Sequence, residues 1–442
     1  MSIARDSLLR IYWVTSLCAL AFACGIAVGV YKIFPYELLQ QIGFTARELI
    51  RYPRHTLGLA PEKFLAVSPP PGGGVTRHVP EQAYAGMTLI AGFFDDSLGV
   101  RLIDMNGDVL NHWPISYNEV WPESPHLDDQ PRDWDTELHG AWLMPDGDVI
   151  FTFQYGGLVR MERCGRVRWK LPRRTHHVFT PDADGTFWVP DRRRREEAID
   201  QYPKVPAPFE EDYIVKVSPE GEVLAEISIL DLIFRSRLEG LVFANGAHDS
   251  EMVVPLSGDF THLNDVDVLS PETAPAFPLF EAGDLLVSLR NLNLLMVIDP
   301  DTESVKWTRT GPFLRQHDPD FLPNGRIAVF DNRRDGGGDH SFGGSRILSI
   351  DPGVSREITL FGARPDQFFY TDTMGDHQPL KNGNLLVSES QKGHVFEIAP
   401  AGKVVWSWVN RWQDGSIGKI SQATRYPPDY LVQSMKEPCH EP

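Results

Sequence analysis

Histidines recur at the start of predicted β-hairpins along this chain of 442 residues. His139, His177 and His317 each stand eight residues before a glycine that is predicted to lie in a hairpin turn. His377 stands six residues before such a glycine, and His262 opens a further unit whose spacing is blurred by an insertion. Imidazole groups bind metals, act as nucleophiles or transfer protons near neutral pH. Five histidines at matching places therefore indicate a shared site rather than five separate packing residues.

Arg290, in the segment LVSLRNLN, favours one of these chemistries. It follows the strand predicted as the inner strand of the His262 unit, so it is expected near the same mouth of the central channel. A guanidinium beside imidazoles repels a metal dication, but it binds an oxyanion through two parallel hydrogen bonds. The set therefore predicts a site for a sulfate- or phosphate-like group, with no metal and no cofactor.

The histidines belong to repeated units. One unit reads HGAWLMPDGDVIFTFQYGGLVRMERCGRVRWKLP and holds several short strands separated by turns that contain Gly, Asn or Asp. Strands at this spacing, without helical periodicity between them, are typical of a sandwich, a barrel or a propeller. Repetition favours the propeller, because each small sheet needs neighbours to bury both of its faces. Six units can be recognised, so we predict an all-β fold, a six-bladed β-propeller over residues 81–442.

The propeller explains how distant histidines could meet. The innermost strand of each blade faces the central channel, so residues at the starts of these strands converge near one mouth of the channel. Trp169, Trp307 and Trp406 stand at matching places near the ends of their units and are expected to pack between blades. The tail from Trp412 has no clear repeat pattern and is expected to cover an edge.

The N-terminal segment differs from the rest of the chain. Ile11 to Tyr31 carries no charge and is long enough to cross a bilayer as a helix. It is also longer than the apolar core of a cleavable signal. We predict a transmembrane signal-anchor helix at residues 11–34, after a short tail at 1–10 and before a linker at 35–80. A short tail followed by a large domain fits export of the C-terminal side.

The net charge limits the kinds of molecule that the protein is expected to bind, and the cysteine content limits its possible disulfides. The formal net charge is −18, which argues against nucleic acid, whose phosphates require a basic surface. The run from Arg192 to Arg195 is followed at once by two glutamates and is read as a solvated loop. Outside the apolar segment the cysteines are Cys164 and Cys439, which allow one bridge but do not require it.

At this point the chain resembles a known family, the bacterial arylsulfate sulfotransferases, which are six-bladed periplasmic propellers. The resemblance covers roughly residues 85–410. It is carried by the pair His176-His177, by His262-Leu263-Asn264 followed by Val287-Ser288-Leu289-Arg290, and by Gln316-His317 running into Phe330-Asp331-Asn332.

The resemblance implies a ping-pong transfer of a sulfuryl group from an aryl sulfate to a phenol, without a nucleotide donor and without a metal. The residue at the His317 position takes the sulfuryl group as a sulfohistidine. His177, His262 and Arg290 hold the sulfuryl oxygens, and His262 also shuttles the phenolic proton. The remaining expected substrate contacts are His139, His176, Asn264, Gln316 and His377. The expected location is the inner membrane, with a single span and the propeller on the periplasmic side.

The chain departs from the family pattern in three ways. Members are typically exported and released, whereas this chain is expected to be anchored. No cysteine lies between Cys164 and Cys439, so the short-range disulfide near the nucleophile has no counterpart. The segment 35–80 is too short for the separate N-terminal β-domain that members use in dimerisation, which leaves the oligomeric state open. Two alternative functions remain: a non-catalytic, membrane-tethered propeller that acts as a scaffold or ligand sensor, and an oxygenase whose iron is bound by histidines, against which Arg290 counts.

Overall fold

The computed structural model describes most of the chain. The described residues are 2–31, 33–66, 71–95, 97–202, 205, 207–244, 247–248, 251–252, 258–334, 342–354, 356–412 and 415–432. Cys439 and residues 67–70 of the predicted linker lie outside them. The chain divides into two compact units, Met1–Lys63 and Phe64–Pro442, and each is described by itself.

The first unit is helical. Helix α1 (Ser2–Tyr31) contains a segment, Arg10–Tyr31, that is long and apolar enough to cross a membrane. It ends three residues before the predicted boundary at residue 34, and it includes most of the predicted N-terminal tail. Helices α2 (Tyr36–Arg51) and α3 (Pro53–Thr56) and the short helix η1 (Glu62–Phe64) follow. The segment predicted as a linker over 35–80 therefore contains these three helices.

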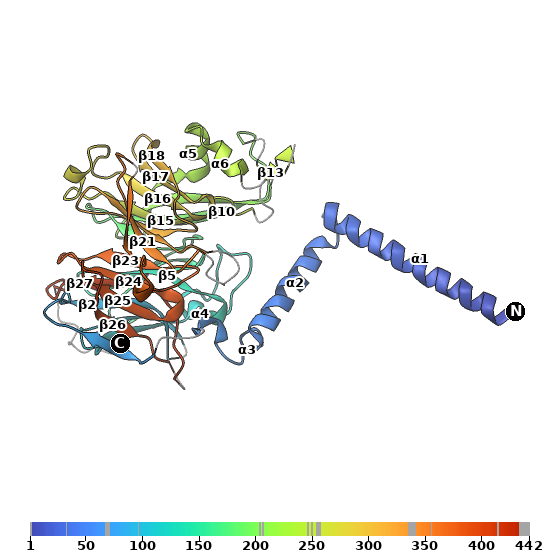
Figure 1. Ribbon diagram of the computed structural model, residues 1–442, viewed down its shortest axis with the longest axis horizontal. Coiled ribbons are helices and arrows are strands. Elements are labelled where there is room, and N and C mark those ends of the chain that lie inside the picture. Colours follow the sequence, from blue (N-terminus) through green and yellow to red (C-terminus); the bar gives the residue numbers. More distant parts are fainter. Residues whose placement is uncertain are drawn as a thin grey trace. The chain divides into compact units, whose positions relative to one another are not determined.

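The second unit is a six-bladed β-propeller built from antiparallel sheets (Figure 1). Blade 2 consists of β5 (Leu138–Leu143), β6 (Val149–Phe153), β7 (Gly157–Met161) and β8 (Val167–Leu171). Blade 3 consists of β9 (Thr180–Pro181), β10 (Phe187–Arg195), β11 (Phe209–Val217) and β12 (Val223–Ser228). Blade 4 consists of β15 (Leu263–Val268), β16 (Leu285–Leu289), β17 (Leu294–Asp299) and β18 (Ser304–Thr310).

Two further blades follow in chain order. Blade 5 consists of β19 (His317–Phe321), β20 (Ile327–Asp331), β21 (Arg346–Ile350) and β22 (Glu357–Phe361). Blade 6 consists of β23 (Asp376–Pro379), β24 (Leu385–Glu389), β25 (His394–Ile398) and β26 (Val404–Val409). Between blades 3 and 4 lie α5 (Ile229–Arg235), α6 (Glu239–Ala244) and the two-stranded sheet of β13 (Ala247–His248) and β14 (Glu251–Met252).

The first and last strands of the propeller, β1 (Gly74–His78) and β27 (Ile420–Tyr426), each join a blade whose other strands lie far away in the sequence. Blade 1 has only three strands from its own unit, β2 (Met87–Phe94), β3 (Ser97–Ile103) and β4 (Val109–Ile115), and its innermost strand is β27. Strand β27 pairs with β2, beside which it lies in Figure 1, so the C-terminal segment closes the ring instead of covering an edge as predicted. Strand β1, within the predicted linker, joins blade 6 through β26.

Tryptophans link neighbouring blades, as the sequence predicts. The indole N–H of Trp169 donates to the carbonyl of Pro219 in the next blade at 2.9 Å. Trp307 makes the equivalent bond to the carbonyl of Pro352 at 3.2 Å, and Trp406 bonds across the ring closure to Met105 at 2.9 Å. Each indole buries a large apolar surface and also satisfies a carbonyl of the adjacent blade, so the same residue type holds the blades in a fixed relation.

The arginine run from Arg192 to Arg195 is the clearest error in the sequence-based interpretation. It forms the end of β10 and pairs with β11, where acidic residues stand directly opposite Arg192, Arg193 and Arg194. Arg192 is buried, and Arg195 bonds to Glu211 at 2.5 Å. A run of like charges looks solvated in isolation. Here a strand that carries the opposite charges lies beside it, which sequence adjacency could not reveal.

Replacing Lys381 by proline tests the hairpin geometry. In the turn from Leu380 to Gly383 the glycine N–H donates to the leucine carbonyl at 2.9 Å. The turns that contain Pro145, Pro219, Pro323 and Pro400 have the same bond, with proline in the position of Lys381. We expect Lys381→Pro to raise the free energy of unfolding by about 0.4–1 kcal/mol, because it restricts the unfolded chain.

Thr424→Pro is compared with Lys381→Pro by chemical denaturation, because it places proline in a strand instead of a turn. The backbone N–H of Arg425 bonds to Gln378 of blade 6, so the N–H of Thr424 points the other way, toward β2. Proline removes this ladder bond at the ring closure. We expect Thr424→Pro to destabilise the protein by more than Lys381→Pro stabilises it. Equal effects of the two substitutions would contradict the assigned role of β27.

Candidate active site

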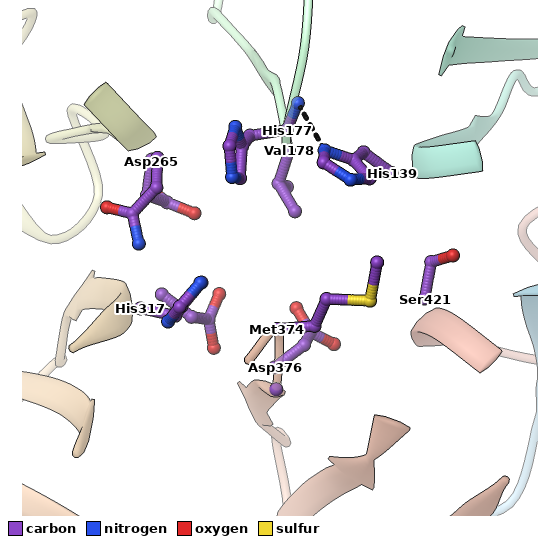
Figure 2. A pocket seen from close by; sticks show the side chains of 11 residues that line it. His139, His177, Val178, Asp265, His317, Met374, Asp376 and Ser421 are labelled. Atoms are coloured by element: carbon purple, nitrogen blue, oxygen red, sulfur yellow. Dashed lines mark hydrogen bonds between the residues drawn. The ribbon is translucent and has the colours of Figure 1, made fainter. Parts of the chain in front are cut away.

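A narrow cavity lies on the propeller axis and receives residues from all six blades (Figure 2). Its lining consists of His139, His177, Val178, Asn264, Asp265, His317, Asp318, Met374, Gly375, Asp376 and Ser421. The ring centroid of His177 lies 4.6 Å from that of His139, 5.2 Å from that of His262 and 6.3 Å from that of His317. Histidines of four blades are therefore close neighbours, as the propeller interpretation of the spacing requires.

Irregularities in the inner strands aim several of these residues into the cavity. In four blades the register of the innermost strand shifts near its start, which inserts one extra residue into that strand. The residues at these shifts are His139, Asn264, Asp318 and Ser421, and all four line the cavity. A bulge of this kind bends the strand and redirects a side chain, and bulges are frequent next to active sites.

The imidazole of His317 is held in one tautomer. Its Nδ1 lies 2.7 Å from Oδ1 of Asn332 and 3.2 Å from the carbonyl of Arg315. The amide of Asn332 has a defined orientation, because its Nδ2 donates to the carbonyls of Thr371 and Met374 at 3.0 and 2.6 Å. Two acceptors at Nδ1 require a proton there. The neutral ring therefore carries its lone pair on Nε2.

Burial keeps this ring neutral. His317 is buried, which lowers its pKa to about 3, and the positive charge of Arg290 contributes in the same direction. The hydrogen bond from Nδ1 to Asn332 opposes the shift but does not cancel it. At neutral pH the Nε2 atom is therefore unprotonated, and its lone pair is available without a separate base.

The pair His176-His177 and His139 form a second part of the cluster. The backbone N–H of His177 donates to Nδ1 of His139 at 3.1 Å, as Figure 2 shows, so the neutral His139 ring carries its proton on Nε2. The Nδ1 atoms of His176 and His177 lie 2.7 Å apart, so one of them donates and the other accepts. Burial lowers the pKa of both rings well below the usual value. These rings offer directed N–H donors without net charge.

His262 contacts a chain of charged groups. Its Nδ1 lies 2.5 Å from Oδ2 of Asp259, whose other oxygen accepts from Arg192 at 2.8 Å. Arg192 also bonds to Asp212 at 3.1 Å. Burial favours protonation of Asp259, but its bond to His262 and the neighbouring arginines lower its pKa to about 2. The pKa of His262 is lowered by burial. Its Nε2 has no hydrogen bond to any described residue, which suits a proton shuttle.

Arg290 lies at the same end of the ring. Its backbone N–H donates to the carbonyl of His262 at 3.0 Å, and it begins the short helix η4 (Arg290–Leu292). Burial lowers the pKa of its guanidinium to about 10, so the group is still charged at neutral pH. Within the described part of the chain it forms no salt bridge, and its side chain has only a 3.4 Å bond to Asn291. A desolvated cation that forms no salt bridge with a described carboxylate is suited to an anionic ligand.

The other predicted contact residues have different positions. Asn264 lines the cavity and donates through Nδ2 to the carbonyl of Gln316 at 2.7 Å. Gln316 lies behind the lining, where its Nε2 bonds to Ser288 at 3.0 Å and to the carbonyl of Leu294. His377 is not part of the lining and bonds instead to Asp318. Of the predicted site residues, four belong to the lining, His139, His177, Asn264 and His317, whereas His176, His262, Arg290, Gln316 and His377 do not.

Carboxyl groups at the axis were not predicted. Asp265, Asp318 and Asp376 line the cavity, and burial raises the pKa of each, to about 7 for Asp318. Asp259, Arg192 and Asn332 were likewise not assigned roles from the sequence. The motif FDN contains Asn332, but its contact with His317 depends on the pairing of β19 with β20.

The chain belongs to the arylsulfotransferase family. The family model described as arylsulfotransferase (ASST) matches residues 140–411, which include every predicted site residue except His139. None of the curated proteins matches the sequence.

Among solved structures, a protein of unknown function from Bacteroides caccae is 15% identical; the match covers 76% of this chain and 98% of that chain, with a TM-score of 0.47. Virginiamycin B lyase from Staphylococcus aureus is 11% identical; the match covers 61% and 69% of the two chains, with a TM-score of 0.34.

The protonation of His317 can be followed directly. We expect its ring to remain neutral, with the proton on Nδ1, down to pH 5 in NMR spectra of protein labelled with ¹⁵N-histidine. Asn332→Asp places a negative charge at Nδ1 and should raise the pKa of His317 from about 3 toward 6.5. Asn111→Asp is the control, because Asn111 lies on the outer strand β4. A wild-type ring that titrates near pH 6.5 would contradict this assignment.

Proposed function

We propose that the protein transfers a sulfuryl group from an aryl sulfate to a phenolic acceptor through a sulfohistidine at Nε2 of His317. The main support is the orientation of that ring. Asn332 and the carbonyl of Arg315 both accept at Nδ1, so the lone pair lies on Nε2. Membership of the arylsulfotransferase family supports the reaction class.

In the first half-reaction the lone pair of Nε2 forms a bond to sulfur, and the bond between sulfur and the aryl oxygen breaks. The electron pair of that bond leaves with the aryl group as a phenolate. The imidazole ring gains positive charge as it is sulfurylated, and the oxygens of Asn332 and Arg315 at Nδ1–H stabilise that charge. Asn332 is a neutral acceptor, so it stabilises the intermediate less strongly than a carboxylate would and leaves it reactive.

In the second half-reaction the oxygen of a phenol attacks sulfur, and the bond between Nε2 and sulfur breaks. The phenolic proton must be removed as the new bond forms. Nε2 of His262 is assigned this role, since the ring is neutral and Asp259 accepts from its Nδ1. The resulting imidazolium returns the proton to the phenolate that is released in the next turnover. Two displacements with a covalent intermediate replace one direct transfer.

The sulfuryl oxygens require fixed donors during both steps. Arg290 supplies a charged fork, and His177 and His139 supply rings near that of His317. His176 supports this group through its bond to His177. Preorganised donors in a desolvated site stabilise developing negative charge without reorganisation. The scheme uses only groups of the protein.

We further propose that α1 anchors the enzyme as a single span in the inner membrane, with the propeller on the periplasmic side. The apolar helix is compatible with this arrangement. Cys164 is disulfide-bonded, and disulfides persist mainly in oxidising compartments such as the periplasm.

Substitution of His317 tests the reaction. The full chain in detergent, incubated with 4-nitrophenyl sulfate and a phenol, is expected to release nitrophenolate. After incubation with the donor alone, the peptide that contains His317 should gain one sulfuryl group by mass spectrometry. His317→Ala should lose both signals. His78→Ala is the control, because His78 lies on β1 at the outer edge of blade 6.

The alternative functions predict different results in the same assay. No turnover and no adduct with varied phenols would favour a non-catalytic, membrane-tethered propeller. Activity that depends on added iron and oxygen and leaves no adduct on His317 would favour an oxygenase. Either outcome would overturn the proposed transfer.

Arg290→Lys separates the charge of the side chain from its shape. Lysine keeps the positive charge but cannot form two parallel hydrogen bonds to an oxyanion. We expect a loss of about tenfold to a hundredfold in kcat/KM for 4-nitrophenyl sulfate, which corresponds to about 1.4–2.7 kcal/mol of transition-state stabilisation. Arg411→Lys serves as the control, because the Arg411 guanidinium donates instead to the carbonyl of Gly72. Near-normal turnover by Arg290→Lys would contradict the role assigned to Arg290.

A further inference from the structure

A second group of polar side chains lies at the junction of blades 5 and 6. Asp318 and Asp320 belong to β19, and His377 belongs to β23. One potential ligand atom from each lies within 4.8 Å of the others, and in the part of the chain that the structure describes no other such group of histidine, cysteine or acidic residues is found. The sulfuryl-transfer scheme uses none of these three side chains.

The tautomer of His377 leaves a nitrogen available. Its Nδ1 lies 2.5 Å from Oδ2 of Asp318, and its backbone N–H donates to the same oxygen. A carboxylate at Nδ1 places the ring proton there, so Nε2 carries the lone pair. Histidines that bind metals are oriented in this way, with a carboxylate at the other ring nitrogen.

The available nitrogen faces a carboxylate at the spacing of two metal ligands. Nε2 of His377 lies 3.5 Å from Oδ2 of Asp320. Neither atom has a hydrogen bond to a described residue, although His377 is only 2% exposed. The separation exceeds that of a normal hydrogen bond. Two ligands at about 2.1 Å from one tetrahedral ion are about 3.4 Å apart.

The carboxyl groups around this group of side chains also favour binding of a cation. Asp265 and Asp376 line the same cavity as Asp318. Among the described residues no lysine or arginine forms a salt bridge with these three aspartates or with Asp320. A buried set of carboxyl groups must be protonated or must bind a cation. The side chain of Asp320 is 23% exposed, so an ion can reach the group.

We propose that Asp320, His377 and Asp318 form a site for one divalent metal ion of the Mn²⁺ or Zn²⁺ type. Oxygen ligands combined with one imidazole fit these ions better than Cu⁺, which prefers sulfur. The ion would be bound by Oδ2 of Asp320 and Nε2 of His377, and Asp318 would orient the imidazole. It would link the inner strands of two blades next to His317 without entering the sulfuryl-transfer step. This assignment replaces the predicted substrate contact of His377.

Direct metal binding tests the site independently of sulfuryl transfer. The full chain, purified in detergent without a polyhistidine tag, is stripped with a chelator and desalted. Titration with Mn²⁺ alone, followed by EPR of the free ion, should show one bound ion per chain, and Zn²⁺ should displace it. Thermal unfolding of the stripped protein should shift to higher temperature when either ion is added.

Two variants and a matched control locate the ion. Asp320→Asn keeps the shape of the side chain and should weaken Mn²⁺ binding at least tenfold, and His377→Gln should do the same. His394→Gln is the control in the same blade, because both ring nitrogens of His394 have partners, Glu389 at 3.0 Å and Ser407 at 2.9 Å. It should bind Mn²⁺ like the wild type.

Two results would overturn this proposal. One is wild-type protein that binds neither Mn²⁺ nor Zn²⁺, which would mean that protons neutralise the carboxyl groups. The other is an unchanged Mn²⁺ affinity in the folded Asp320→Asn variant. This variant tests the site even if His377→Gln does not fold. Loss of sulfuryl transfer in His317→Ala bears on the proposed function and leaves the metal site unaffected.

Discussion

Pairing of β27 with β2 is the contact on which the rest of the molecule depends. It closes a ring in which every blade contributes to the axial cavity, including Ser421 from the closing strand itself. An open ring would still contain six sheets, but the histidines would no longer be held around one point. Because β27 follows the other described strands of the propeller in the sequence, the inner edge of β2 has no strand to pair with until β27 has been synthesised. An exposed strand edge of this kind is prone to mispairing.

Neutral imidazoles and fixed protons define the chemical character of the cavity. Burial lowers the pKa of His177, His262 and His317, so several of these rings can lie close together without mutual repulsion. Partners at Nδ1 then determine which nitrogen is a donor and which has a lone pair. Asp259 and Asn332 perform the same geometric task with different charge, and this difference separates a ring suited to proton transfer from one suited to nucleophilic attack.

The sequence predicted much of the architecture, because repeats and turns are local patterns. The repeated hairpins indicated the propeller, and the spacing of His139, His177 and His317 placed them at one end of the channel. The interblade tryptophans were also correctly interpreted. Each of these features can be read within a few tens of residues, and the propeller then converts equal positions in the repeat into proximity in space.

What could not be predicted depends on contacts between distant segments. Arg192 looked like part of a solvated run because its partners, Asp212 and Asp259, lie in other elements. The closing strand β27 has no repeat of its own and pairs with residues more than 300 positions earlier in the chain. The role of Asn332 required a defined ring orientation for His317, and no sequence pattern gives a side-chain rotation.

The four residues at the strand bulges affect how the cavity of a propeller can change in evolution. His139, Asn264, Asp318 and Ser421 stand outside the regular pairing of their strands. A different side chain at one of these places alters the cavity without disturbing the alternation of inward and outward residues along the strand. Mutations there can change reactivity while the scaffold stays intact, so related propellers have a small set of sites at which evolution can exchange one chemistry for another.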